Sequence, residues 1–222
     1  MRGSRRVNRI TDPQSFRQAF EVSRETLDRL ILYEKLLCQW QKAVNLVAPA
    51  TLEDIWHRHF ADSAQLARLV PDYAERLADL GSGGGFPGLV LAIVLRDRRQ
   101  VQVSLVESDT RKAAFLREVS RQTGVPVDIF ASRIENSETQ RKVGEVDLVT
   151  VRALAPLSRL LGLAAPFFAP RTVGLFLKGR DIHGEIDEAR VGWRFDVELV
   201  PSMTDAQGQI AVVRNVRAKT EG

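Results

Sequence analysis

The stretch that most constrains the fold is LADLGSGGGFPG, residues 77–88, which is followed at once by the apolar run 89–95. Asp79 closes a short apolar segment, and Pro87 falls where a first helical turn would tolerate its missing N–H. Between them three glycines alternate: Gly81, Gly83 and Gly85. Because glycine has no Cβ, such a turn can take positive φ and let a ligand lie against the backbone. The pattern predicts the first strand, turn and helix of a nucleotide-binding α/β fold.

Two cofactors are consistent with this loop. Residues 83–88 fit G-x-G-x-x-G, and Glu107 follows where a dinucleotide-binding fold places its ribose-binding carboxylate. Read from Asp79, the segment is instead acid-x-Gly-x-Gly-x-Gly, the form found in S-adenosylmethionine-dependent methyltransferases. A carboxylate before the turn would repel a pyrophosphate but can meet the charged amino-acid part of the methyl donor. The loop favours the methyl donor, with a dinucleotide or a purely structural turn as alternatives.

Composition bounds the remaining possibilities. A chain of 222 residues with 44% hydrophobic content can bury a full core, so we expect one main domain with an extension. We expect a cytoplasmic protein without a membrane partner, because no apolar run reaches membrane-spanning length and no secretory signal is recognisable. The formal charge of +4 permits a nucleic-acid partner. The single Cys38 lies in a helical pattern and is expected to be a buried small hydrophobe.

The first third of the chain is expected to be helical. We predict a disordered basic arm over 1–14, a helical extension over 15–74 and a methyltransferase domain over 75–222. Apolar spacing predicts two helices between residues 15 and 44, and a third over 52–69 with Thr51 as its N-cap.

The predicted third helix carries His57, His59, Asp62 and Ser63. Side chains two residues apart point to different sides of a helix, so His57 and His59 do not predict a metal site. We expect Asp62 and a histidine to pin neighbouring loops instead.

After the glycine-rich loop, strands and helices alternate. Strands are predicted over 101–106, 125–131, 146–151, 172–177, 193–200 and 209–216. Helices are predicted over 109–123, from an Asp109 cap to Gly124, over 157–168 with an early end at Pro166, and over 181–189. The last two strands are joined too closely for a crossover helix and should pair antiparallel at the sheet edge. The sequence predicts a doubly wound sheet with ligands at the carboxyl ends of its strands.

Polar residues follow the predicted strands at that end: Asp79, Glu107 and Ser108, residues 132–135, Arg152 and Lys178. Glu107 suits two ribose hydroxyls because a carboxylate can accept from both. Ile134 and Glu135 are placed to bracket an adenine. Arg152 directly follows an apolar strand, so its guanidinium needs a partner: a cofactor carboxylate, a substrate phosphate or an acidic residue in an internal salt bridge. The same alternatives apply to Lys178.

Seven segments together resemble one family, the RsmG or GidB 16S ribosomal RNA guanine-N7 methyltransferases: WQKAVNLVAP, RHFADS, DLGSGGGFPG, DTRKAAFL, SRIEN, VTVRAL and LFLKG. The resemblance covers most of the chain, and NLVAP and RHFADS are its most specific parts. It implies a class I S-adenosylmethionine-dependent fold, Rossmann-like with an antiparallel terminal strand and an N-terminal helical extension. It also implies a monomer whose partner is 16S rRNA in the 30S subunit.

With the resemblance, the expected cofactor site comprises Asp79, Gly81, Gly83, Gly85, Phe86, Glu107, Ser108, Ile134, Glu135 and Arg152. The basic surface that it implies for RNA comprises Arg111, Lys112, Arg133, Arg152 and Lys178. One departure is that Gly208 or Gln209 stands where relatives often have an arginine, so basic charge returns only at Arg214.

The residues present fit methylation of guanine N7. This atom has an in-plane lone pair and no proton, so we expect no general base. We also expect no metal site, and a positioning role for Arg152. The sequence has no Asn-Pro-Pro-aromatic motif and no cysteine in the predicted strands, which argues against methylation of exocyclic amines and of pyrimidine carbon 5. An NAD-dependent oxidoreductase and a non-catalytic RNA-binding module of the same fold remain the alternatives.

Overall fold

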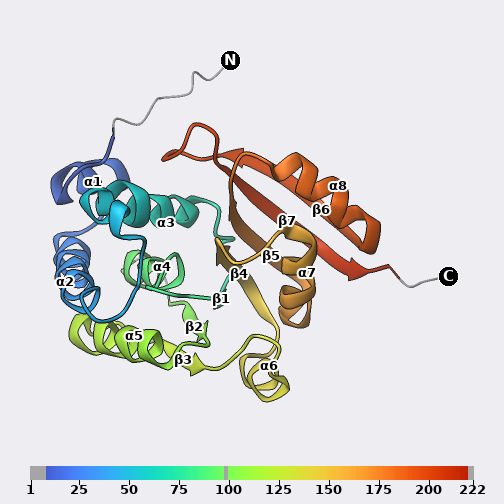
Figure 1. Cartoon of the computed structure of the whole chain (residues 1–222), viewed down its shortest axis with the longest axis horizontal. Helices are drawn as coiled ribbons and strands as arrows, with labels where there is room; N and C mark the ends of the chain where they lie inside the picture. Colours follow the sequence, from blue (N-terminus) through green and yellow to red (C-terminus); the bar gives the residue numbers. More distant parts are fainter. Residues whose placement is uncertain (1–8, 98–99, 220–222) are drawn as a thin grey trace.

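Seven strands form one sheet in the computed structural model, which describes residues 9–97 and 100–219 (Figure 1). The strand order is β3-β2-β1-β4-β5-β7-β6. Strands β1 to β5 run parallel, whereas β7 pairs antiparallel with both β5 and β6. The strands are β1 (Arg76–Leu80), β2 (Gln102–Glu107), β3 (Asp128–Ala131), β4 (Val146–Arg152), β5 (Phe168–Lys178), β6 (Trp193–Pro201) and β7 (Gln209–Ala218). The predicted doubly wound sheet with an antiparallel terminal hairpin is confirmed.

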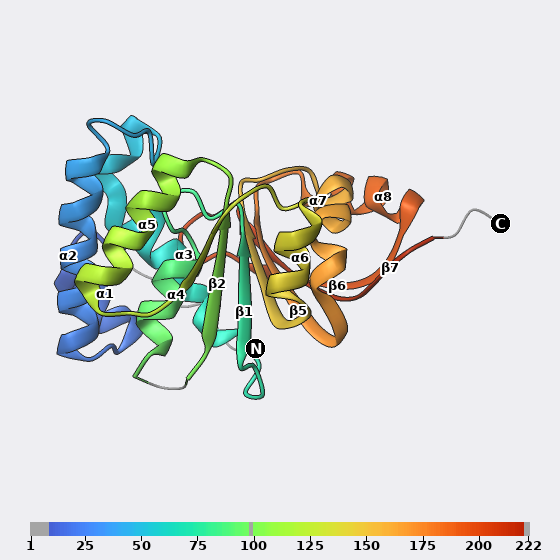
Figure 2. The ribbon, with the colours of Figure 1, turned by 90° about the horizontal axis from the view of Figure 1, so that it is seen from below.

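Helices cover both faces of the sheet (Figure 2). One face carries α4 (Gly88–Leu95) and α5 (Thr110–Thr123), and the other carries α6 (Ser137–Val143), α7 (Leu157–Ala164) and α8 (Ile182–Gly192). Successive strand residues serve the two faces in turn, so Leu77 and Ala78 belong to separate apolar clusters. All of α4 is buried, because the N-terminal helices pack over the side that faces away from the sheet. No helix of the described residues is long and apolar enough to cross a membrane.

The two predicted N-terminal helices are present as α1 (Pro13–Phe20) and α2 (Arg24–Trp40). Defined structure is present before residue 15, because Asp12 and Ser15 form a capping box and the side chain of Ile10 is buried. The first eight residues of the expected arm lie outside the described residues. Cys38 is exposed, contrary to the prediction, because Leu36 and Leu37 occupy the inward face of α2.

The predicted third helix is divided into four short turns of different pitch. A 3-10 turn (Pro49–Asp54), a π-helical segment (Trp56–Ala61), α3 (Asp62–Ala64) and a second 3-10 turn (Gln65–Arg68) follow one another. Thr51 is inside the first turn and not an N-cap, since its hydroxyl donates to the Ala48 carbonyl at 2.7 Å. Irregular pitch of this kind is typical of functional segments, because it turns side chains away from regular helical positions.

The caps of α5 agree with the prediction. Asp109 accepts from the Arg111 N–H at 2.8 Å, and Gly124 ends the helix in the left-handed conformation with a φ of 64°. The α7 helix ends at Ala164, one residue before a short turn that contains Pro166. The short α6 helix was not predicted, because six of its seven residues are polar and show little helical periodicity.

Candidate active site

The three alternating glycines have positive φ angles of 72° at Gly81, 56° at Gly83 and 92° at Gly85. A Cβ on Gly85 would collide with the hydroxyl of Tyr33, which lies beneath the loop and donates to the Gly84 carbonyl. A Cβ on Gly83 would face open space, with its nearest neighbour, the Gly81 carbonyl oxygen, at 3.9 Å. Gly85 therefore permits close packing under the loop, whereas Gly83 keeps room above it for a ligand.

Glu107 at the end of β2 holds the loop. Its Oε2 accepts from the Gly83 N–H at 2.8 Å, and its Oε1 accepts from the Asp109 N–H at 2.7 Å. Each carboxylate oxygen retains a second lone pair for a ligand. Glu107 can thus shape the loop and accept from ribose hydroxyls at the same time.

A pocket of about 360 Å³ opens at the carboxyl ends of β1, β2 and β3, and we call it the first pocket. Its wall brings together most of the residues expected to bind the cofactor: Gly81, Gly83, Glu107, Ser108, Ile134 and Glu135. The remaining four, which are Asp79, Gly85, Phe86 and Arg152, do not line it.

Asp79 lies fully buried beneath the loop. Thr150 donates to its Oδ1 at 2.7 Å, whereas its buried Oδ2 has no hydrogen-bond partner among the described residues. Burial raises the pKa of this carboxyl to about 6, against the lowering effect of the Thr150 hydrogen bond. A buried carboxylate with an unpaired oxygen lowers the stability of the fold. Such groups are typical of functional sites.

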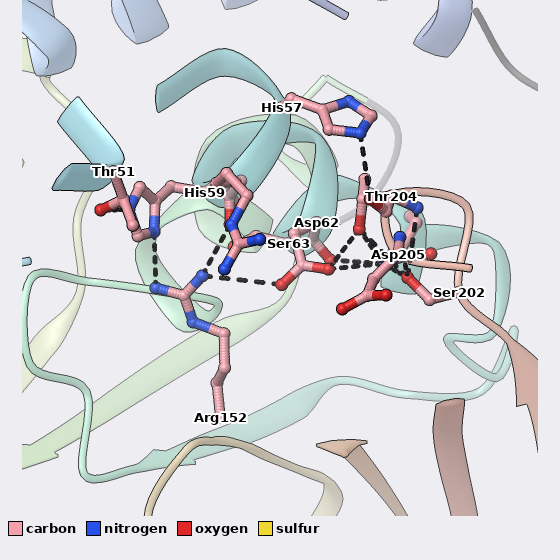
Figure 3. A network of polar contacts seen from close by, with 11 residues as sticks. Thr51, His57, His59, Asp62, Ser63, Arg152, Ser202, Thr204 and Asp205 are labelled. Atoms are coloured by element: carbon pink, nitrogen blue, oxygen red, sulfur yellow. Dashed lines mark hydrogen bonds and ion pairs between the residues drawn. The ribbon is translucent and has the colours of Figure 1, made fainter. Parts of the chain in front are cut away.

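Arg152 at the end of β4 turns toward the segment that contains Arg58, His59 and Asp62 (Figure 3). Its guanidinium donates to the Arg58 carbonyl at 3.0 Å, lies 2.9 Å from Nδ1 of His59 and pairs with the Asp62 carboxylate at 3.6 Å. It also lies 5.0 Å from the ring centre of Phe86, which stacks on Tyr33. The side chain is only 19% exposed, so the segment holds the guanidinium in one place.

The hydrogen bonds of His59 define its tautomer. The Thr51 hydroxyl already donates to the Ala48 carbonyl, so Nε2 of His59 must donate to that hydroxyl oxygen, 2.8 Å away. Nδ1 is then free to accept from Arg152. Burial, and then the charges of Arg152 and Arg58, lower the pKa of His59 to about 3, which keeps the imidazole neutral.

The same contacts extend to the loop between β6 and β7. The Thr204 hydroxyl donates to Oδ1 of Asp62 at 2.6 Å, and Nε2 of His57 donates to the Thr204 carbonyl at 3.0 Å. Gln65 also bonds this loop, because its Oε1 accepts from the Met203 N–H at 2.8 Å. The expectation that Asp62 and a histidine pin neighbouring loops is confirmed. The contributions of Thr51, Gln65 and Thr204 had no signal in the sequence, since each depends on distant partners.

The five basic residues expected to meet RNA divide into two groups. Arg111 and Arg133 are exposed, and Arg133 and Lys112 line the first pocket. Lys178 is only 9% exposed at its side chain, pairs with Glu185 at 2.5 Å and donates to the Ala155 carbonyl at 2.9 Å. Arg152 is committed to internal partners in the same way. Strands β4 and β5 are central in the sheet, so cations at their ends need internal partners, and the internal salt bridge was one of the alternatives expected for both residues.

A second pocket, of about 480 Å³, adjoins the first. Both pockets are lined by Leu154 and Ala155, which follow β4. The second pocket also contacts the β6–β7 loop through Ser202, Asp205 and Gly208. Two ligands could therefore approach each other across one short apolar wall.

The fold of the chain is that of S-adenosylmethionine-dependent methyltransferases of known structure. The chain resembles the Podospora anserina methyltransferase PaMTH1 bound to S-adenosylhomocysteine, with a TM-score of 0.58 and 14% identity over 87% of this chain and 88% of that one. It also resembles a putative S-adenosylmethionine-dependent methyltransferase of Methanococcus maripaludis, with a TM-score of 0.54 and 10% identity over 85% and 94% of the two chains. At these identities the likeness concerns the fold.

Sequence comparison gives the family. The family described as rRNA small subunit methyltransferase G, GidB, matches residues 26–213. The ribosomal RNA small subunit methyltransferase G of Parvibaculum lavamentivorans is 53% identical over 207 residues, which cover 93% of this chain and 91% of that protein. The protein of the same name from Rhodospirillum centenum is 54% identical over 202 residues, covering 91% and 88%. The chain belongs to this family of methyltransferases, and this membership supports S-adenosylmethionine as the cofactor.

Proposed function

We propose that this protein transfers a methyl group from S-adenosylmethionine to N7 of a guanine in 16S rRNA of the small ribosomal subunit. The names of the relatives, ribosomal RNA small subunit methyltransferase G, support the substrate. The observation that carries the proposal is the wall shared by the two pockets, where Leu154 and Ala155 offer no acid–base side chain. Guanine N7 carries no proton, so its methylation needs no acid–base side chain.

The first pocket fits the methyl donor. Gly83 leaves room against the loop, Glu107 has free lone pairs for the ribose, and Ile134 and Glu135 stand where an adenine can lie. When bound, S-adenosylmethionine supplies a methyl group on a sulfonium, and the N7 lone pair displaces the sulfur so that the positive charge passes to the base. Arg152 acts as a positioning residue, because its partners fix it beside Phe86 under the loop. The protein contributes alignment and exclusion of water.

The basic residues beside the first pocket are proposed to meet the RNA backbone. Arg111, Lys112 and Arg133 lie beside the first pocket, where phosphates next to the target nucleotide would pass. Lys178 and Arg152 support the site from within. A small-subunit substrate would place the protein in the cytoplasm, where we propose that it acts as a monomer.

The proposal predicts base-specific methyl transfer. The purified protein is incubated with methyl-labelled S-adenosylmethionine and with small subunits from a strain that lacks the gene. We expect label in 16S rRNA, and mass spectrometry of nuclease digests should find 7-methylguanosine at one position. Protein-free subunits and subunits from the parent strain are the controls, and neither should gain label. Label in another atom or another RNA would refute the proposed substrate. Binding to the subunit without any transfer would favour the non-catalytic RNA-binding module.

A further inference from the structure

We propose that the second pocket receives the target guanine and that the Asp205 carboxylate recognises it by accepting hydrogen bonds from N1–H and the N2 amino group. This inference rests on the proposed function and adds to it the residue that selects the base. It assigns a role to the β6–β7 loop, which the cofactor site does not use.

The charges around the second pocket do not suit a phosphate. Arg152 pairs with Asp62 at 3.6 Å and Lys178 pairs with Glu185 at 2.5 Å, so both cations on the wall are neutralised by carboxylates on the same wall. Asp205 makes no ion pair within the described part of the chain and leaves the pocket with excess negative charge. Such a pocket repels an anion and attracts a neutral group that is rich in donors.

The loop fixes the backbone of Asp205 while leaving its side chain available. The Asp205 N–H donates to the Ser202 hydroxyl at 3.3 Å, and the Asp205 carbonyl accepts from the Gly208 N–H at 3.0 Å. Figure 3 shows the carboxylate turned away from Thr204, whose hydroxyl anchors the loop to Asp62. Among residues 9–97 and 100–219, the one hydrogen bond to the Asp205 carboxylate comes from the Gln207 N–H, which donates to Oδ1 at 2.9 Å. The carboxylate can therefore accept further hydrogen bonds at the pocket wall.

Guanine matches this arrangement better than the other bases do. Its N1–H and N2 amino group are adjacent donors that one carboxylate can accept together, whereas adenine places an acceptor at N1. N7 lies on the other side of the purine from these donors. A base held by Asp205 can thus present N7 toward Leu154 and Ala155, the wall shared with the cofactor pocket. A site built around such hydrogen bonds rejects a base that lacks the donors.

The test uses 16S RNA that is assembled by splint ligation, with either guanosine or inosine at the mapped target, and reconstituted into small subunits. Inosine keeps N7, O6 and N1–H but lacks the N2 amino group. For the wild-type enzyme, kcat/KM should fall at least about tenfold on inosine, the usual effect of losing a hydrogen bond to a charged group. Asp205→Asn should methylate guanosine about tenfold less well than wild type and should discriminate little between the two bases. Its affinity for S-adenosylmethionine should be unchanged in calorimetry.

The matched control is Asp187→Asn, which makes the same chemical change at an exposed position of α8 outside the pocket. It should keep both the rate and the preference for guanosine. Equal wild-type rates on guanosine and inosine, or an unchanged preference in folded Asp205→Asn, would overturn the role of Asp205 while leaving the proposed function intact. Absence of methylation of the guanosine subunits by wild-type enzyme would overturn the proposed function itself.

Discussion

Single residues of the glycine-rich loop have separable roles. Gly85 has a φ of 92° and lies against the Tyr33 hydroxyl, so its lack of a Cβ serves the packing of the loop on α2. Gly83 has a φ of 56° but open space where a Cβ would be, so its lack of a side chain serves the ligand. The sequence pattern alone gives the two glycines the same meaning.

Alanine at each position should separate stability from affinity. Gly85→Ala should lower the free energy of unfolding by about 3 kcal/mol, because a strained φ and a steric clash add together. Gly83→Ala should lower the free energy of unfolding by about 1 kcal/mol, because alanine is disfavoured in the left-handed conformation. It should also weaken the binding of S-adenosylmethionine at least about tenfold. Urea unfolding and calorimetry measure the two effects. Wild-type donor affinity in folded Gly83→Ala would contradict the placement of the donor over the loop.

At the scale of elements, the irregular segment 49–68 and the β6–β7 loop form one unit with the end of β4. Asp62 links them, because its two carboxylate oxygens meet Thr204 and Arg152 respectively. The irregular pitch of the segment places its side chains where they can bond to Arg152 and to the loop. The hydrogen bond between Thr204 and Asp62 should therefore contribute to stability.

Thr204→Val tests this link, since valine has the shape of threonine without the hydroxyl. It should lower the free energy of unfolding by about 1–2 kcal/mol, because Asp62 loses a hydrogen bond to a charged oxygen. Thr204→Ser keeps the hydroxyl and should stay closer to wild type. Urea unfolding of the three proteins gives the comparison, and equal stability of the valine and serine variants would show that this hydrogen bond has no net effect.

At the scale of the whole molecule, the sequence predicted the sheet more fully than the site. Strand and helix alternation fixes a parallel sheet, and the short connection before β7 requires the antiparallel edge, so the topology follows from local patterns. The strand-end positions of Glu107 and Arg152 follow from the same patterns. The partners of Arg152 do not, because His59 is 93 residues away in the sequence. An internal salt bridge was among the partners expected for Lys178, but the sequence did not identify Glu185 as that partner.

We propose that the methyl-donor pocket and the base pocket meet at Leu154 and Ala155. The most direct measurement is a crystal structure of the protein with S-adenosylhomocysteine and a guanosine-containing fragment of its RNA. We predict the adenosine against Glu107 in the first pocket, the guanine against Asp205 in the second, and N7 facing the sulfur across the shared wall. A guanine bound outside the second pocket, or one that turns another edge toward the sulfur, would contradict this arrangement of the two pockets.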